Sequence, residues 1–148
     1  MNYKLMLYLQ KCLFVNSCVY VVWVFTIAFF FYTKINHYDH IVKYLSVTLC
    51  IMFIIIEIIR LYLGQTGNLL CRVPELSSFL MLSIFMQAPV MTYFLFNPYL
   101  MNTPIETVLH AFMWVIILLE ILVCFPALKQ ACSIAKTTYL SSSKIGRE

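Results

Sequence analysis

Four long apolar stretches constrain what this chain can fold into more than any other feature of its sequence. They cover residues 13–33, 44–63, 76–96 and 105–128. Each can cross a membrane, because a spanning helix needs about 20 mostly apolar residues to match a hydrocarbon core about 30 Å thick. We therefore predict an all-α membrane protein, in which residues 1–148 form a single four-helix transmembrane bundle.

Composition excludes the main alternatives to a helical membrane protein. Hydrophobic residues make up 63% of the chain and charged residues 11%, whereas a soluble domain carries about 25% charged residues. The chain has three glycines and no period-two alternation, which argues against a membrane β-barrel. Nucleic-acid readers, soluble oxidoreductases and secreted disulfide scaffolds are excluded together with the soluble class, so we expect a membrane and no nucleic acid as partner.

The basic residues predict how the bundle is oriented. Lys and Arg in short loops stay on the cytoplasmic side of a membrane. If the N-terminus is cytoplasmic, eight of the ten basic residues lie in or near the cytoplasm, and two, Lys34 and Lys43, lie outside. Both termini are therefore expected to be cytoplasmic. The first stretch is expected to be a retained span and not a signal peptide, because bulky residues 29–32 stand where a cleavage site would need small ones.

The six cysteines predict no disulfide framework. In this orientation they lie near the cytoplasmic face, where thiols stay reduced, or inside spans. Cys12 and Cys132 lie beside basic residues at the membrane edge, where a cysteine can be palmitoylated. The more ordinary interpretation is that each is a small apolar filler residue.

Two acids and one base lie deep within the predicted spans, more than two residues from either end. Glu57 and Arg60 belong to the second span and Glu120 to the fourth. Helical rise places the two carboxyls about 9 Å and about 12 Å from the inner ends of their spans, so they share a depth. An unpaired charge at the bilayer centre costs about 2.5 to 3.5 kcal/mol, so we predict an interhelical polar clasp. The alternative is a proton or cation site.

The clearest helix start in the sequence precedes the fourth span. Residues 103–106 read Thr-Pro-Ile-Glu, which places Thr103 at the N-cap and Glu106 at the third helical position. This is the pattern of a capping box, in which the two side chains satisfy backbone N–H groups reciprocally. Thr103 and Glu106 are therefore predicted to be structural.

Glycine and proline predict the connection between the second and third spans. Gly64 is expected to end the second span as a C-cap, and Gly67-Asn68 to form a tight turn after it. Pro74 and Glu75 are expected to open the third span, because proline suits the first helical position and an acid suits the helix N-terminus. Pro89 predicts a kink in the middle of that span.

No motif in the sequence predicts catalysis or a resident cofactor. There is no glycine-rich phosphate loop, no Gly-x-Ser-x-Gly and no Cys-x-x-Cys. His37, Asp39 and His40 are the only metal-like group, and three candidates within one tetrapeptide rarely make a metal site. His110 is expected near the outer surface, as an interfacial residue. We predict a protein that is not an enzyme and binds no metal.

Part of the chain is unlike generic membrane sequence and resembles a known family. The resemblance rests on residues 57–69, which read EIIRLYLGQTGNL, on Val-Pro-Glu-Leu at 73–76, on Gln-Ala-Pro at 87–89, and on the fourth span from residue 104 to 129. These segments closely resemble the Transmembrane-17 family of small tetraspan proteins. The likeness covers about residues 50–130 and is faint over the first span.

The resemblance implies a location and a set of partners. Members of that family are implied to reside in the membrane of the ciliary transition zone, in a complex with tectonic and Meckel-syndrome proteins. That complex supports cilium assembly and a diffusion barrier at the ciliary base. The connection from Gly64 to Glu75 is then expected to be a cytoplasmic docking surface. Its candidate docking residues are Gly64, Gly67, Asn68, Arg72, Pro74 and Glu75.

Three hypotheses follow from the sequence. The leading one is a non-enzymatic structural component of the transition-zone membrane complex, acting as a homo- or hetero-oligomer. The second is a small oligomeric proton-coupled transporter that uses Glu57 and Glu120. A water-accessible cavity around these acids would favour the transporter, and closure of Arg60 on them in a dry bundle would oppose it. The third is an assembly chaperone of the endoplasmic reticulum.

Overall fold

The computed structural model describes residues 3–100 and 102–145, which are helical almost throughout and contain no strand. The elements are α1 (Tyr3–Lys34), α2 (His40–Leu69), α3 (Val73–Leu82), a π-helix (Ser83–Gln87), α4 (Ala88–Phe96), a short 3-10 helix (Pro98–Leu100) and α5 (Pro104–Ile145). Four helical segments are long and apolar enough to span a membrane: Lys4–Lys34, His40–Leu69, Val73–Phe96 and Pro104–Ser143. The predicted all-α membrane fold is confirmed, and each predicted span lies within one of these segments.

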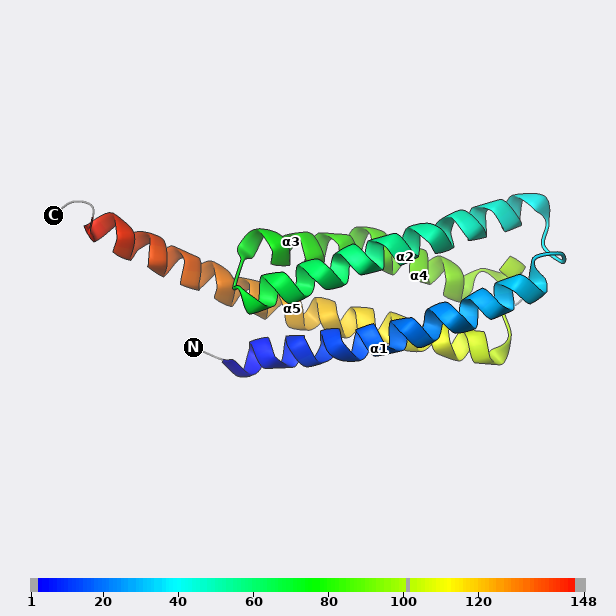
Figure 1. Ribbon diagram of the computed structural model, residues 1–148, viewed down its shortest axis with the longest axis horizontal. Helices are drawn as coiled ribbons and strands as arrows, with labels where there is room; N and C mark the ends of the chain where they lie inside the picture. The colour runs from blue at the N-terminus through cyan, green and yellow to red at the C-terminus, as the bar shows by residue number, and fades with distance from the viewer. Residues whose placement is uncertain (1–2, 101, 146–148) are drawn as a thin grey trace.

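The four segments run side by side as an elongated bundle (Figure 1). α1 packs along α5, and α2 packs along α3. The α1–α2 and α4–α5 connections lie at one end, which we call the loop end, and the α2–α3 turn lies at the other, the terminal end. Both ends of the described chain lie on the terminal side, and the last part of α5 projects beyond the other helices.

The α2–α3 connection differs from the prediction. α2 continues through Gly64 and Gly67 to Leu69, so the expected C-cap at Gly64 and turn at Gly67-Asn68 are wrong. The chain reverses instead at residues 70–72, where Cys71 has a φ of 50°. The N–H of Arg72 donates to the carbonyl of Gly67 at 3.0 Å, which is the closing bond of a Schellman motif. Glycine misled the prediction because neither glycine here has a positive φ.

The third span is interrupted just before Pro89. Residues Ser83–Gln87 form a π-helix, in which the N–H of Ala88 donates to the carbonyl of Ser83, five residues back. Proline has no N–H, so Pro89 cannot form the α-helical bond to the carbonyl of Phe85. A wider turn at this point accommodates the missing bond, and π-turns within α-helices often occur at functional positions. Here the turn positions two polar side chains, Ser83 and Gln87.

The interior is divided into two apolar layers with a polar layer between them. The layer toward the terminal end includes Leu9, Leu13, Leu76, Phe79 and Cys124. The layer toward the loop end includes Tyr20, Trp23, Phe53, Met91, Met113 and Ile117. On α1, α2 and α5 alike, the residues between these layers include a buried polar or charged side chain. The core therefore changes from apolar to charged and back to apolar along the bundle axis.

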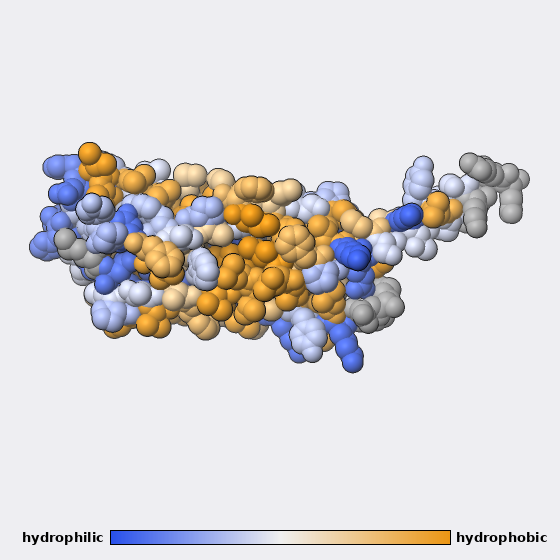
Figure 2. Space-filling view, turned by 180° about the vertical axis from the view of Figure 1, so that it is seen from behind, coloured by the Kyte–Doolittle hydropathy of each residue, from blue (hydrophilic) through white to orange (hydrophobic). Residues whose placement is uncertain are grey.

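The outer surface has the pattern expected for contact with lipid. Figure 2 shows hydrophobic residues concentrated along the middle of the bundle and hydrophilic residues gathered toward its two ends. Phe25 is 74% exposed, Val108 70% and Leu122 67%. Side chains as apolar as these are stable on the outside of a bundle when hydrocarbon surrounds it.

Apart from Arg60, which is buried inside the bundle, the described basic residues lie toward one or the other end of it. Lys34 and Lys43 lie near the loop end, and Lys4, Lys11, Arg72, Lys129 and Lys136 lie toward the terminal end or on the projecting part of α5. Arg147 and the side chain of Lys144 lie outside the described residues. The placement of the terminal end in the cytoplasm stays a prediction from this charge distribution.

Candidate functional site

A buried group of charged and polar side chains lies at the centre of the bundle. All four spans contribute to it, and every member has an exposed fraction of 0%. We call this set the buried charged cluster; its members are Asn16, Glu57, Arg60, Ser83, Gln87 and Glu120. The structure thus brings together the three charges that the sequence singled out, and adds uncharged groups that hydrogen-bond to them.

Within α2, Glu57 and Arg60 form a bidentate ion pair. They are three residues apart and so lie on one face of the helix. Arg60 Nη2 lies 2.6 Å from Glu57 Oε1, and Arg60 Nε lies 3.1 Å from Glu57 Oε2. Two parallel N–H bonds to one carboxylate fix the plane of the guanidinium as well as its charge. The remaining edge of the Arg60 side chain is thereby directed away from α2.

That remaining edge joins α2 to two other helices. Arg60 Nη1 donates to Glu120 Oε2 of α5 at 2.5 Å and to Ser83 Oγ of the π-helix at 3.2 Å. The ring of Phe79 lies under the guanidinium, with its centroid 5.1 Å from Cζ, an arrangement in which the ring face attracts the cation. Ser83 can accept from Arg60 because its own hydroxyl donates to the carbonyl of Phe79 at 2.8 Å.

Two amide side chains complete the cluster. Asn16 Nδ2 of α1 donates to Glu57 Oε1 at 2.8 Å and makes a longer bond of 3.3 Å to Glu120 Oε2. Gln87 Nε2 donates to Glu57 Oε2. The sequence analysis placed no role on Asn16 or Ser83. The signal available was their polarity within an apolar span, although a single Asn or Ser is too common there to identify a site.

The arrangement is that of a closed structural contact. Each charge is taken out of water, and a buried ion pair recovers that cost only when good geometry and further hydrogen bonds satisfy both partners. Here the guanidinium contacts both carboxylates, and removing Arg60 would leave both acids buried without their cationic partner. The cluster therefore ties the helices to one another in a fixed register.

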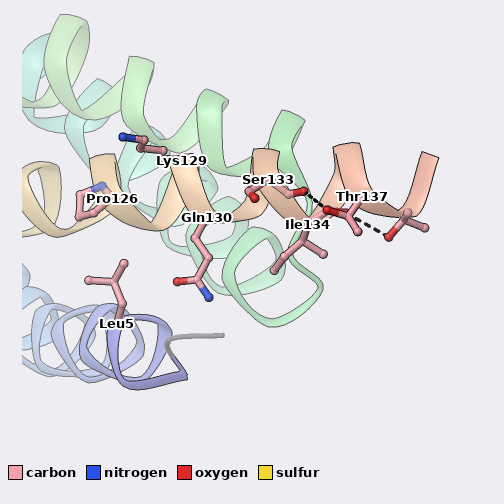
Figure 3. Close-up of a pocket in the computed structure, with 8 residues that line it drawn as sticks. Leu5, Pro126, Lys129, Gln130, Ser133, Ile134 and Thr137 are labelled. Carbon is pink, nitrogen blue, oxygen red and sulfur yellow. Dashed lines mark hydrogen bonds between the residues drawn. The ribbon is translucent and has the colours of Figure 1, made fainter. Parts of the chain in front are cut away.

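A wide surface recess lies elsewhere in the molecule. It is found where α5 leaves the bundle beside the first residues of α1, and its lining includes Leu5, Pro126, Gln130, Ser133 and Thr137. Figure 3 shows Gln130 extending from α5 toward the side on which Leu5 lies. The hydroxyl of Thr137 donates to the backbone carbonyl of Ser133 and is thus used within α5. No member of the buried charged cluster lines this recess.

His110 is not interfacial, contrary to the prediction. It is 1% exposed, and its Nδ1 accepts a hydrogen bond from Trp23 Nε1 at 3.1 Å. Because the indole N–H is a donor only, Nδ1 must carry a lone pair in this contact. The ring of Phe94 stacks on the imidazole with an interplanar angle of 15°. The prediction failed because it placed His110 by depth alone, whereas an aromatic partner on α1 allows the ring to be buried.

At the loop end, Thr103 and Glu106 form the capping arrangement at the start of α5. The N–H of Thr103 donates to Glu106 Oε2 at 2.6 Å, and the N–H of Glu106 donates to Thr103 Oγ1 at 3.4 Å. Lys34, the last residue of α1, forms an ion pair with the same Glu106. The carboxylate thus serves a cap and an interhelical contact at once.

Tyr38, in the α1–α2 connection, also closes the loop end. Its hydroxyl donates to the carbonyl of Leu100 at 2.8 Å. Burial, reinforced by the negative charge of Glu106, raises the pKa of Tyr38 to about 12. The hydroxyl therefore keeps its proton, and the bond it donates, throughout the physiological pH range.

The residues expected to form a docking surface are divided by the structure. Gly64, Gly67 and Asn68 are buried within the bundle, so their expected role in contacting a partner is wrong. Asn68 Nδ2 instead donates to the carbonyl of Met6 at 2.9 Å and to Gln10 Oε1 at 3.1 Å. These three residues hold α2 against its neighbours.

Arg72, Pro74 and Glu75 lie at the surface of the terminal end. Arg72 and Pro74 are exposed, and Glu75 is partly exposed. Arg72 Nη1 lies 3.2 Å from Glu75 Oε1, so the two form a surface ion pair across the first turn of α3. Leu69 and Leu70 are 67% and 57% exposed beside them. The accessible part of this connection is thus the turn itself and the start of α3.

No group of three or more His, Cys, Asp or Glu side chains in residues 3–100 and 102–145 is placed to hold a metal ion. His37, Asp39 and His40 are exposed residues at the α1–α2 connection. All six cysteines are free, with Cys132 exposed and Cys12 partly buried.

Comparison with known proteins matches residues 11–117 to the Transmembrane-17 family, described as a predicted membrane protein. Transmembrane protein 17 of Rattus norvegicus is 34% identical over 122 residues, which are 82% of this chain and 62% of that protein. The Homo sapiens protein of the same name is 32% identical over the same shares. Transmembrane protein 17A of Xenopus tropicalis is 40% identical over 89 residues, which are 60% of this chain and 48% of that protein.

The chain spans about three-fifths of the length of the mammalian relatives that it matches, at 62% of each. No solved structure matches it. The names of the relatives describe a membrane protein and mention no enzyme activity. The family match covers all of the buried charged cluster except Glu120, which lies three residues beyond its end at 117. On these grounds the chain belongs to the Transmembrane-17 family.

Proposed function

We propose that this protein is a non-enzymatic structural component of the ciliary transition-zone membrane complex, the tectonic and Meckel-syndrome module. In this role it supports cilium assembly and the diffusion barrier at the ciliary base. The observation that carries the proposal is the family match over residues 11–117, which includes most of the bundle.

The use of polar groups in the bundle supports a structural role. The charged side chains of the spans contact one another, with Glu57, Arg60 and Glu120 all at 0% exposure. Catalysis or transport needs charged groups that a substrate can reach, whereas an assembly component needs a rigid body and outward-facing surfaces. The outward-facing surfaces here are the apolar helix faces and the turn at the terminal end, and these are the surfaces we assign to partner proteins.

The proton-coupled transporter remains the alternative function. It needs water to reach Glu57 or Glu120 in at least one state of the protein. The closed contact of Arg60 with both acids speaks against it, because the guanidinium occupies carboxylate oxygens of both acids that a transported proton or cation would have to reach. Flux in liposomes that is lost in Glu57→Gln would favour this alternative.

Localisation tests the proposal most directly. The full chain, carrying a fluorescent tag, is expressed in ciliated cells and imaged together with a transition-zone marker. We expect enrichment at the ciliary base and co-precipitation with a tectonic protein. Uniform plasma-membrane signal would overturn the proposal, and retention in the endoplasmic reticulum would favour an assembly chaperone.

A matched pair of variants tests which end of the bundle binds the partner proteins. Arg72→Gln removes an exposed charge at the terminal end, and Lys43→Gln removes a partly exposed charge near the loop end. If the α2–α3 turn is the docking surface, Arg72→Gln weakens co-precipitation while Lys43→Gln leaves it at the level of the unaltered chain. Equal effects of the two variants would contradict docking at the turn.

A further inference from the structure

The two carboxylates of the buried charged cluster receive different numbers of hydrogen bonds. Glu57 accepts four, of which two come from Arg60, one from Asn16 and one from Gln87. Both oxygens of Glu57 are used, each by two donors. All four positions at which a carboxylate can accept a hydrogen bond are thus used by donors.

Glu120 is bonded on one side only. Its Oε2 accepts from Arg60 Nη1 at 2.5 Å and from Asn16 Nδ2 at 3.3 Å. Its Oε1 is buried and has no hydrogen-bond partner among the described residues. A carboxylate oxygen that is ionised, dry and without a donor is a costly arrangement, because charge is poorly tolerated where nothing solvates it.

The charges of the cluster do not balance. Glu57 and Glu120 each carry one negative charge when ionised, and Arg60 carries one positive charge, so one negative charge remains. The other titratable groups that interact with the acids of the cluster are Cys12 and Tyr20 on α1 and Cys124 on α5, and neutral thiols and a neutral phenol offer no compensation. The remaining members, Asn16, Ser83 and Gln87, are uncharged. A single additional positive charge would make the cluster neutral.

We propose that the buried charged cluster is a binding site for one proton, held on Oε1 of Glu120. The proton forms one O–H bond with a carboxylate oxygen, and no other bond is made or broken. The cluster then contains one carboxylate, one guanidinium and one carboxylic acid, and its net charge is zero. This proton is a resident part of the folded bundle, and the proposal requires neither transport nor the ciliary role.

Replacing each acid by glutamine, its neutral isostere, distinguishes the roles of Glu57 and Glu120. In Glu120→Gln, the amide oxygen keeps the bond from Arg60 and the NH₂ group takes the place of the protonated Oε1, which no donor faces. In Glu57→Gln, the NH₂ group must face donors of Arg60, Asn16 or Gln87, whichever way the amide is turned. The first variant therefore reproduces the proposed state, and the second replaces attraction with repulsion between donors.

Infrared spectroscopy of the purified full chain in lipid nanodiscs tests the site. The C=O stretch of a protonated carboxylic acid is separate from carboxylate bands and shifts in D₂O. At neutral pH we expect this band in the unaltered protein and in the control Asp39→Asn, which removes an exposed acid, and we expect it to be absent in Glu120→Gln. Absence of the band from the unaltered protein, or its survival in Glu120→Gln, would overturn the proposal.

Thermal unfolding gives a second, independent measurement. Glu120→Gln is expected to melt close to the unaltered protein, whereas breaking the bidentate pair in Glu57→Gln lowers the melting temperature by about 10 °C. Equal losses in both variants would contradict a proton localised on Glu120. A rise in melting temperature with added NaCl, but not with choline chloride, that is lost in Glu120→Gln would assign the site to a metal cation instead. Failure of Glu57→Gln to fold leaves the infrared test of Glu120 unaffected.

Discussion

Two glycines in α2 serve close packing and not chain reversal. A Cβ placed on Gly67 would lie 2.8 Å from the backbone nitrogen of Leu76, at the start of α3. A Cβ placed on Gly64 would lie 2.8 Å from the Phe79 ring and 3.0 Å from a methyl group of Leu13. Small residues at such positions let helices in a membrane approach closely. α2 can therefore lie directly against α3 only because these two side chains are absent.

Replacing glycine by alanine is expected to lower the free energy of unfolding by different amounts at positions 64 and 67. In Gly67→Ala the new methyl group meets backbone, which cannot rotate away, and we expect a loss of about 1 to 3 kcal/mol in the free energy of unfolding. In Gly64→Ala it meets side chains, which can shift, so the loss is expected to be smaller. Both variants gain the same helix propensity, about 1 kcal/mol. The difference between their free energies of unfolding therefore measures how much more the contact with backbone costs at position 67 than the contact with side chains costs at position 64.

Reversible unfolding in mixed detergent micelles measures these free energies. Gly64→Ala is the matched control for Gly67→Ala, because both positions are helical and buried. A larger loss in Gly64→Ala than in Gly67→Ala would contradict the close approach of the α2 and α3 backbones.

At this scale, the sequence predicted the charges better than the small residues. Glu57, Arg60 and Glu120 could be paired because burial of an ion in lipid demands a partner, whatever the details of packing. Gly64 was misassigned because a glycine that opens space for a neighbour looks the same in sequence as one that ends a helix. The partner that explains it, Phe79, belongs to the next span.

The start of α5 combines a local motif with a tertiary contact. The capping box of Thr103 and Glu106 can be read from four consecutive residues, because both partners lie within one turn. The ion pair of Glu106 with Lys34 cannot, since it joins residues 72 positions apart. The residue at which α5 begins can thus be predicted from the sequence, although the ion pair that holds this end of α5 against α1 cannot.

The cap gives a prediction for this element. Thr103→Ala removes the hydroxyl that accepts from the N–H of Glu106, and we expect it to cost about 1 kcal/mol. Thr107→Ala is the control, because Thr107 is exposed and its hydroxyl bonds to the carbonyl of Thr103, which already accepts the N–H of Thr107. Hydrogen exchange of the first-turn amides of α5 should accelerate in Thr103→Ala and stay unchanged in Thr107→Ala. Equal exchange in both variants would mean that Thr103 does not cap α5.

The sequence predicted the length of each helix only for the part that crosses the membrane, because the thickness of the bilayer determines that length. The apolar stretches defined the parts of the helices that cross a membrane, and each lies within an observed segment. α1 begins before its apolar stretch and α5 continues well past residue 128. These extensions consist of more polar turns, for which the thickness of a bilayer gives no signal.

For the molecule as a whole, the testable quantity is the side of the membrane on which each end lies. The bundle places the described chain ends together and the α1–α2 connection at the opposite end. With the five other cysteines replaced by alanine, Cys132 reports the terminal end. We expect a membrane-impermeant maleimide to label Cys132 only after cells are permeabilised, because the basic residues favour a cytoplasmic terminal end.

A cysteine introduced at the exposed Asn36 provides the control at the loop end. Asn36→Cys, with all six native cysteines replaced, is expected to react in intact cells. The reverse pattern would contradict the orientation. Reaction of both positions from the same side would contradict the three membrane crossings that lie between residues 36 and 132.

The position of Glu120 in the last span has a consequence for the order in which the bundle can be built. α2 carries its own charge pair, so it can enter a membrane with Glu57 and Arg60 already neutralising each other. α5 is synthesised after α1, α2 and the π-helix, so its acid meets the guanidinium only once those elements have been made. Until then the free edge of Arg60 faces no acid from another helix. The contact between Arg60 and Glu120 therefore closes only after the chain has been made as far as the fourth described span.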